Sequence, residues 1–137
     1  MQIYLAGQYK QKDELMAVAA KLRAKGFTVV ARWLDEPHAA SITLAEISDE
    51  RLEQYAKIDL EDIDDCDEFI FFSLSPETLS VRGGRHVEFG YALAKKKYIA
   101  VIGPKENVFH YLSWHPHNVR HHPSIDDWIM CFHLMIP

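Results

Sequence analysis

The sequence contains few cysteines and no excess of positive charge, and each shortage argues against a class of protein. It has two cysteines, Cys66 and Cys131, whose separation matches no metal-binding or redox spacing. Fifteen Lys and Arg residues stand against twenty Asp and Glu residues, a formal net charge of −5. Nucleic-acid binding needs a basic surface. We therefore expect free thiols in a reducing compartment and no nucleic-acid partner.

Long apolar runs are also missing. No stretch is long enough to cross a bilayer, and residues 1–7 lack the basic region and extended apolar core of a signal peptide. These absences predict a cytoplasmic protein without membrane association. The 137 residues, 48% of them hydrophobic, suit one compact core. We predict a single domain over residues 1–137.

Short apolar runs alternate with segments of helical periodicity along the whole chain. Strands are predicted at residues 3–6, 27–31, 69–74, 98–102 and 119–122. Helices are predicted from Asp13 to residue 25, over 44–65, from the glycine pair 83–84 to the lysines at 95–97, and after a capping Ser124. This alternation is typical of a three-layer α/β sandwich with a parallel sheet.

Residues 82–93, with the sequence RGGRHVEFGYAL, connect a predicted strand to a helix N-terminus. Such a junction directs backbone N–H groups and the positive end of the helix dipole to one spot at the carboxyl edge of the sheet. Glu88 is predicted in the first turns of that helix. It can be read as a dipole-stabilising acid, or as a nucleophile that the dipole keeps ionised.

A second carboxylate, Asp59, falls on the apolar stripe of its predicted helix, seven residues after Leu52 and four before Ile63. An inward-facing carboxylate is costly unless it is paired or in use. Asp59 and Glu88 come from helices that flank the same strand. Two acids held close together serve retaining glycosyl chemistry, or they bind Mg²⁺. The spacing leaves both possibilities open.

Two further groups invite ligand-binding interpretations. Arg82 and Arg85 flank the glycine pair, so the turn is either an anion contact or a plain tight turn, and the sequence lacks both phosphate-loop and dinucleotide-binding patterns. Four histidines near the C-terminus have no Cys at ligand spacing and no His-Glu-x-x-His helix, so we expect loop or surface residues rather than a metal site. They are His115, His117, His121 and His122.

The chain resembles the nucleoside 2-deoxyribosyltransferase family, including relatives that hydrolyse the N-glycosidic bond of nucleoside monophosphates. The matching pieces are IYLAG at residues 3–7, the segment from Asp59 to Asp67, and VEFGYAL at residues 87–93. The resemblance implies a flavodoxin-like, five-stranded parallel sheet. It also implies a homo-oligomer with shared active sites, a nucleoside and a free nucleobase as small-molecule partners, and no cofactor.

The resemblance further implies three catalytic roles. Glu88 matches the family nucleophile, which forms a covalent ester at C1′ of the sugar. Tyr4 matches the tyrosine that orients this glutamate, and Asp59 matches the acid that acts on the nucleobase. The predicted substrate contacts are Gly7, Gln8, Tyr9, Arg82, Gly84 and Asn107, with Asn107 reaching the sugar from a neighbouring subunit.

Arg82 departs from the family pattern. Typical transferases carry an Asp six residues before the nucleophile, where it contacts a sugar hydroxyl. The sequence thus predicts a nucleoside (deoxy)ribosyltransferase working by double displacement, with neither metal nor cofactor. Two alternatives stay open: a (deoxy)nucleoside 5′-monophosphate N-glycosidase that uses Arg82 and Arg85 for phosphate, and a non-catalytic nucleotide-sensing domain.

Overall fold

The computed structural model describes residues 1–36, 44–75, 83–114 and 117–135. Five strands form one parallel sheet in the order β2-β1-β3-β4-β5. They are β1 (Gln2–Ala6), β2 (Thr28–Val29), β3 (Glu68–Phe72), β4 (Tyr98–Ile102) and β5 (Val119–His122). This strand order is the flavodoxin-like one, so the predicted fold class is confirmed.

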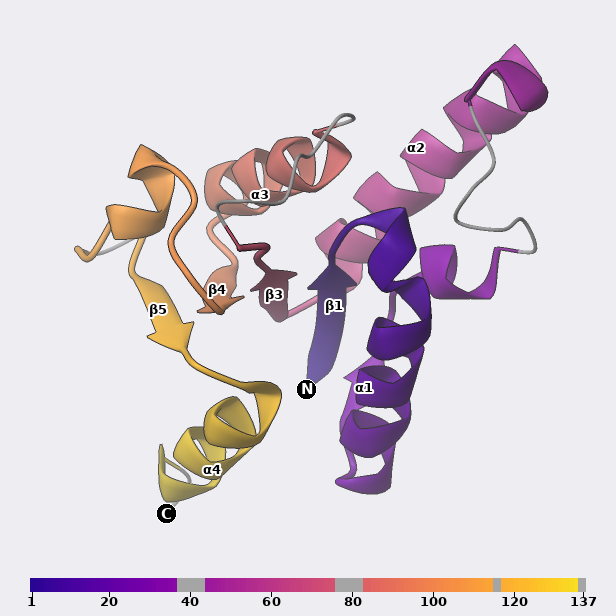
Figure 1. The fold of residues 1–137 in the computed structure, drawn as a ribbon. Coiled ribbons are helices and arrows are strands. Elements are labelled where there is room, and N and C mark those ends of the chain that lie inside the picture. Colours follow the sequence, from indigo (N-terminus) through magenta and orange to yellow (C-terminus); the bar gives the residue numbers. More distant parts are fainter. Residues whose placement is uncertain (37–43, 76–82, 115–116, 136–137) are drawn as a thin grey trace.

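Helices cover both faces of the sheet. The α-helices are α1 (Lys12–Ala24), α2 (Asp49–Asp65), α3 (Gly84–Ala94) and α4 (Ile125–Met135), and the 3-10 helices are η1 (Tyr9–Gln11), η2 (Arg32–Asp35), η3 (Leu44–Glu46) and η4 (Val108–Tyr111). Figure 1 shows α2 and α3 on one face and α1 and α4 on the other. None of the helices described is both long and apolar enough to traverse a bilayer.

The central strands are buried along almost their whole length. Every residue of β3 is buried, as are the last four residues of β1 and of β4. Parallel strands covered by helices on both faces read as continuous apolar runs. For this reason the predicted strands at 3–6 and 98–102 coincide with observed ones or differ by one residue. The predicted strand at 119–122 also coincides with β5, although only Val119 of this edge strand is buried.

The predicted strand at 27–31 is longer than the observed β2. β2 is an edge strand that pairs with β1 alone, through two residues. The chain then leaves the sheet and winds into η2, which buries Trp33 beneath β1. The indole Nε1 of Trp33 donates a hydrogen bond of 2.8 Å to the carbonyl oxygen of Leu5. Trp33 is thereby held in the core.

Side-chain caps set where two of the helices begin. The sequence predicted one of these caps correctly and missed the other. The predicted helix at 44–65 is divided, because Ser48 caps α2 by accepting a hydrogen bond from the amide of Arg51. Ser124 caps α4 as expected, and its Oγ accepts from the amide of Asp127 at 3.1 Å. Asp13 was the wrong cap for α1, because that helix already begins at Lys12.

Candidate active site

Tyr4 and Glu88, 84 residues apart in the sequence, meet on the α3 side of the sheet. Tyr4 lies on β1 and is fully buried, and its hydroxyl donates a hydrogen bond to Oε2 of Glu88. The Tyr4 ring stacks on Phe69 of β3, with 5.5 Å between the ring centroids. Packing therefore holds the hydroxyl in place, and the hydroxyl in turn orients the carboxylate of Glu88.

The start of α3 determines where Glu88 sits. Gly83 is the N-cap and adopts a left-handed conformation with φ of 70°, which glycine tolerates without strain. Gly84 is the first helical residue, so Glu88 falls in the second turn. The dipole effect is confined to the first turn. The dipole interpretation of Glu88, and the expectation that the dipole keeps it ionised, are both wrong.

Burial, followed by the charge of Asp59, raises the pKa of Glu88 to about 8, although the hydrogen bond from Tyr4 works in the opposite direction. Burial also raises the pKa of the Tyr4 hydroxyl, with the charge of Glu88 as the second cause. Tyr4 consequently remains a hydrogen-bond donor at neutral pH. Glu88 stays largely protonated in the empty site.

Two more acids complete what we term the acidic cluster: Glu36, Asp59 and Glu88. Burial raises the pKa of Asp59 to about 7, with Asp62 adding to the shift and Arg32 opposing it. Burial and the charge of Asp59 raise the pKa of Glu36 to about 7 as well. Acids this strongly coupled titrate as a group. At neutral pH the cluster therefore holds both protonated and ionised carboxyl groups.

Asp59 lies half-buried on α2, as its place on the apolar stripe predicted. Its Oδ1 is buried and finds no hydrogen-bond partner among the described residues. The neighbouring Asp62 differs, because the backbone amide and the side-chain Nε of Arg32 both donate to it at 2.8 Å. A buried carboxyl oxygen without a partner is costly in a purely structural role. Asp59 thus retains hydrogen-bonding capacity for a ligand.

Sequence reasoning missed Glu36. It follows η2, at the end of the segment that leaves the carboxyl end of β2. Its position in the sequence could have indicated a site residue, because acids that follow the strands of a parallel sheet lie at the same edge of that sheet. The charge coupling of Glu36 to Asp59 arises because α2 packs against η2 in the tertiary structure.

Arg85 is committed to a structural ion pair. Its Nη2 donates to Oε1 of Glu106 at 2.7 Å, and its guanidinium lies 4.9 Å from the ring centroid of Phe71. Only 2% of the Arg85 side chain is exposed. The expected phosphate contact by Arg85 is therefore not supported. Arg82, its predicted partner in that role, lies outside the described residues.

Breaking this pair should destabilise the fold. Glu106→Ala would leave the Arg85 guanidinium buried and unpaired, which costs about 3–5 kcal/mol. The matched control is Glu53→Ala, because Glu53 forms an exposed pair with Lys57 at 3.4 Å, and such pairs contribute at most about 1 kcal/mol. Urea unfolding of the two variants measures both changes. Equal losses would show that the buried pair contributes no more than a surface pair.

The first loop is tightly built. A Cβ on Gly7 would lie 2.6 Å from Cδ1 of Leu15, so α1 packs against the glycine itself. The amide of Gln8 donates to Oε1 of Gln11 at 2.8 Å. The ring of Tyr9 meets Trp33 edge-on, at 5.7 Å between centroids. Gln8 and Tyr9 are half-buried beyond the end of β1, where a base-binding loop was predicted.

Asn107 caps η4, with its Oδ1 accepting from the amide of Phe109 at 2.9 Å. Its Nδ2 lies 3.4 Å from Nδ1 of His86. His110 is fully buried and accepts at Nδ1 from the amide of Glu106. Burial lowers its pKa to about 4. His110 is thus a core residue, whereas the neighbouring His86 remains partly accessible.

A family model described as nucleoside 2-deoxyribosyltransferase matches residues 3–123. The chain belongs to this family. Members act on small-molecule nucleosides and bases, and the family is enzymatic. The recognition made from the IYLAG and VEFGYAL segments is confirmed. No curated protein matches the chain.

Solved structures share the family fold. The chain is similar to a 2-deoxyribosyltransferase from Bacillus psychrosaccharolyticus, with a TM-score of 0.69 and 20% identity over 93% of this chain and 90% of that one. It is similar to the CMP N-glycosidase of Clostridium botulinum, with a TM-score of 0.59 and 23% identity over 98% and 99%. A Leishmania mexicana 2-deoxyribosyltransferase follows, with a TM-score of 0.52 and 17% identity over 80% and 68%.

Proposed function

We propose that this family member is a nucleoside (deoxy)ribosyltransferase that exchanges nucleobases through a covalent glycosyl-Glu88 intermediate, with retention of configuration. One observation carries the proposal: Glu88 receives the buried Tyr4 hydroxyl and is coupled to Asp59, an acid with an unpartnered oxygen. Retaining glycosyl chemistry needs one carboxylate to attack and one acid to assist departure. The acidic cluster provides both.

In the first step a carboxylate oxygen of Glu88 attacks C1′ from the face opposite the base. The C1′–N bond breaks, its electron pair leaves with the base, and the Asp59 carboxyl group donates the proton that the base accepts. The products are a glycosyl ester on Glu88, a neutral base and ionised Asp59. Proton donation of this kind contributes ~10²–10⁴-fold.

Substrate binding sets the proton distribution that this step needs. Burial raises the pKa of both groups in the empty site, to about 8 for Glu88 and about 7 for Asp59, so the two carboxyl groups hold a proton between them at neutral pH. Positive charge developing at C1′ favours the ionised form of Glu88, as does the hydrogen bond from Tyr4. A base nitrogen next to Asp59 favours a proton on Asp59. These contacts together move the proton from the nucleophile to the acid.

In the second step an incoming base attacks C1′ from the vacated side and gives its proton to Asp59. The bond from C1′ to Glu88 breaks, and the carboxylate is regenerated. Two inversions yield net retention. Water attacking in place of the base would make the same site a hydrolase, so the balance depends on how well the site holds a second base.

The remaining predicted site residues are part of this proposal. Gly7, Gln8 and Tyr9 would line the base pocket, Arg82 and Gly84 would contact the substrate at the start of α3, and Asn107 would reach the sugar of a neighbouring subunit. Exposed apolar side chains beside Asn107 support a homo-oligomer with shared sites. They are Val108, Phe109, Tyr111 and Trp114. We also propose a single cytoplasmic domain that uses no cofactor.

The test incubates purified protein with deoxyinosine and free adenine or cytosine, alongside ribonucleosides and deoxynucleoside monophosphates, and separates the products by chromatography. A new nucleoside supports base exchange, and the reaction that yields it identifies the sugar. Light scattering on the same sample measures the assembly. Free base released only from monophosphates would overturn the transferase in favour of the glycosidase. No product in any reaction would leave a binding domain.

A further inference from the structure

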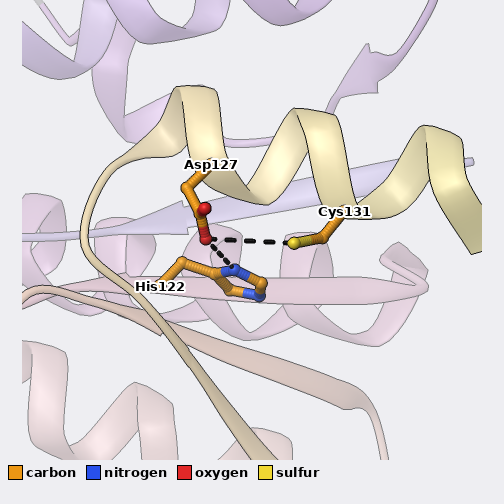
Figure 2. Close-up of side chains that lie close together, drawn as sticks. All are labelled: His122, Asp127 and Cys131. Carbon is orange, nitrogen blue, oxygen red and sulfur yellow. Dashed lines mark hydrogen bonds and ion pairs between the residues drawn. The ribbon is translucent and has the colours of Figure 1, made fainter.

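Three metal-ligating side chains converge on the face of the sheet opposite Glu88. His122 ends β5, and Asp127 and Cys131 follow one turn apart on α4. Nδ1 of His122 lies 2.8 Å from Oδ2 of Asp127, and Sγ of Cys131 lies 3.9 Å from the same oxygen. Figure 2 shows one carboxylate oxygen of Asp127 linked to both the His122 imidazole and the Cys131 thiol.

We propose that His122, Asp127 and Cys131 form a binding site for a divalent transition-metal ion, and the donor set indicates Zn²⁺. The bound ion would crosslink α4 to the edge strand β5. One imidazole nitrogen, one thiolate and one carboxylate oxygen are ligands that Zn²⁺ accepts in tetrahedral sites. Mg²⁺ and Ca²⁺ prefer oxygen ligands alone. The donor set therefore selects the class of ion.

The donor atoms already lie near one another, at separations comparable to those that this ion requires. One donor atom from each residue lies within 4.8 Å of the other two. Bond lengths of about 2.0–2.3 Å to Zn²⁺ place tetrahedral ligands roughly 3.3–3.7 Å apart. Binding would require the side chains to shift until the three donor atoms reach these separations.

The surroundings of the cluster supply independent support. Nε2 of His122 is buried and has no hydrogen-bond partner among the described residues, and the side chain is only 10% exposed. A cavity of about 330 Å³ adjoins the cluster, with His122 and Cys131 in its wall. The cavity offers the ion a path of entry and room for a water as fourth ligand.

The charge balance also favours a cation. Arg120 lines the same cavity, but its guanidinium is ion-paired with the buried carboxylate of Glu68 and so carries little net repulsion. On binding, the Cys131 thiol would release its proton to solvent, while His122 coordinates as neutral imidazole. The dipositive ion would then be neutralised by the Cys131 thiolate and the Asp127 carboxylate.

The spacing in the sequence concealed this cluster. The sequence predicts no metal site at the C-terminal histidines, because no Cys lies at the usual ligand spacing from them. Cys131 stands nine residues after His122, across a turn that reverses the chain. The turn at residues 123–124 lays α4 back along β5, which brings the thiol beside the imidazole.

The test uses tag-free, metal-stripped protein titrated with Co²⁺ and then Zn²⁺. We expect one equivalent of Co²⁺ to produce a thiolate-to-cobalt charge-transfer absorption in the near ultraviolet, which Zn²⁺ abolishes by displacement. Zn²⁺ should raise the melting temperature by about 5 °C or more at saturation, because it binds only the folded arrangement. Mg²⁺ should do neither.

Variants assign the ligands. Cys131→Ser should remove the absorption band, and His122→Ala and Asp127→Asn should weaken Co²⁺ affinity at least tenfold. The matched controls are Cys66→Ala, the other free thiol, and His133→Ala, an exposed histidine of the same helix. Both should keep the band and the thermal shift. A band that survives Cys131→Ser, a band lost in His133→Ala, or the absence of any band would each overturn the proposal.

Discussion

Glu88→Gln should lower the kcat/KM of base exchange by at least ~10⁴-fold, because the amide cannot form the glycosyl ester. Glutamine keeps the volume of the side chain and can still accept the hydrogen bond from Tyr4. Mass spectrometry of the wild type, quenched with a nucleoside alone, should show a glycosyl adduct that is absent in the variant. Exposed Glu53→Gln on α2 serves as the control.

The same substitution should stabilise the protein at alkaline pH. Burial and neighbouring acids raise the pKa of Glu88 from 4.5 to about 8. Between these values the folded protein holds a proton that the unfolded chain has lost, so the free energy of unfolding falls as pH rises, by at most ~1.4 kcal/mol per pH unit. Glutamine cannot ionise and removes this loss.

Denaturant unfolding at pH 4.5 and pH 8.5 measures the effect. The two proteins should differ little in stability at the acidic pH, where folded Glu88 is protonated and unfolded Glu88 is only about half ionised. The variant should be the more stable at the alkaline pH, by ~1–3 kcal/mol. A variant that is inactive and also less stable than the wild type at both pH values would indicate that Glu88 stabilises the fold. That result would contradict a catalytic assignment.

Asp59→Asn should lower kcat by ~10²–10⁴-fold for a natural nucleoside, because the departing base loses its proton donor. Asparagine matches aspartate in shape, so the packing of α2 should persist. An activated 2-deoxyriboside, whose leaving group needs no proton, should restore most of the rate. A loss that is equal for both substrates would contradict proton donation by Asp59.

The pH profile of this variant gives a second readout. The charge of Asp59 is the second-largest cause of the raised pKa of Glu88. Its removal should lower that pKa and move the acidic limb of kcat/KM to lower pH. Asp64→Asn is a matched control on the same helix, because Asp64 is exposed and bonds to the Tyr91 hydroxyl at 2.8 Å instead. It should leave the profile unchanged.

The site was predictable where local pattern and family resemblance coincide. Tyr4 lies within the apolar run of β1, in the register that pairs it with Phe69 of β3, and Asp59 occupies the inward stripe of its helix. The protonation of Glu88 was not predictable. The raised pKa of Glu88 depends first on burial and then on the charges of Asp59 and Glu36, which approach from two other parts of the chain.

Local sequence patterns were enough to predict the alternation of strands and helices, the parallel sheet and the family, because buried parallel strands read as apolar runs and the VEFGYAL segment is continuous in the chain. The tertiary structure alone decided which charged groups are committed and which are available. Arg85 turned inward to Glu106, and His122 met Cys131 across a turn. The physical reason is that pairing, desolvation and charge coupling depend on distances in space, and chain folding sets those distances between residues far apart in the sequence.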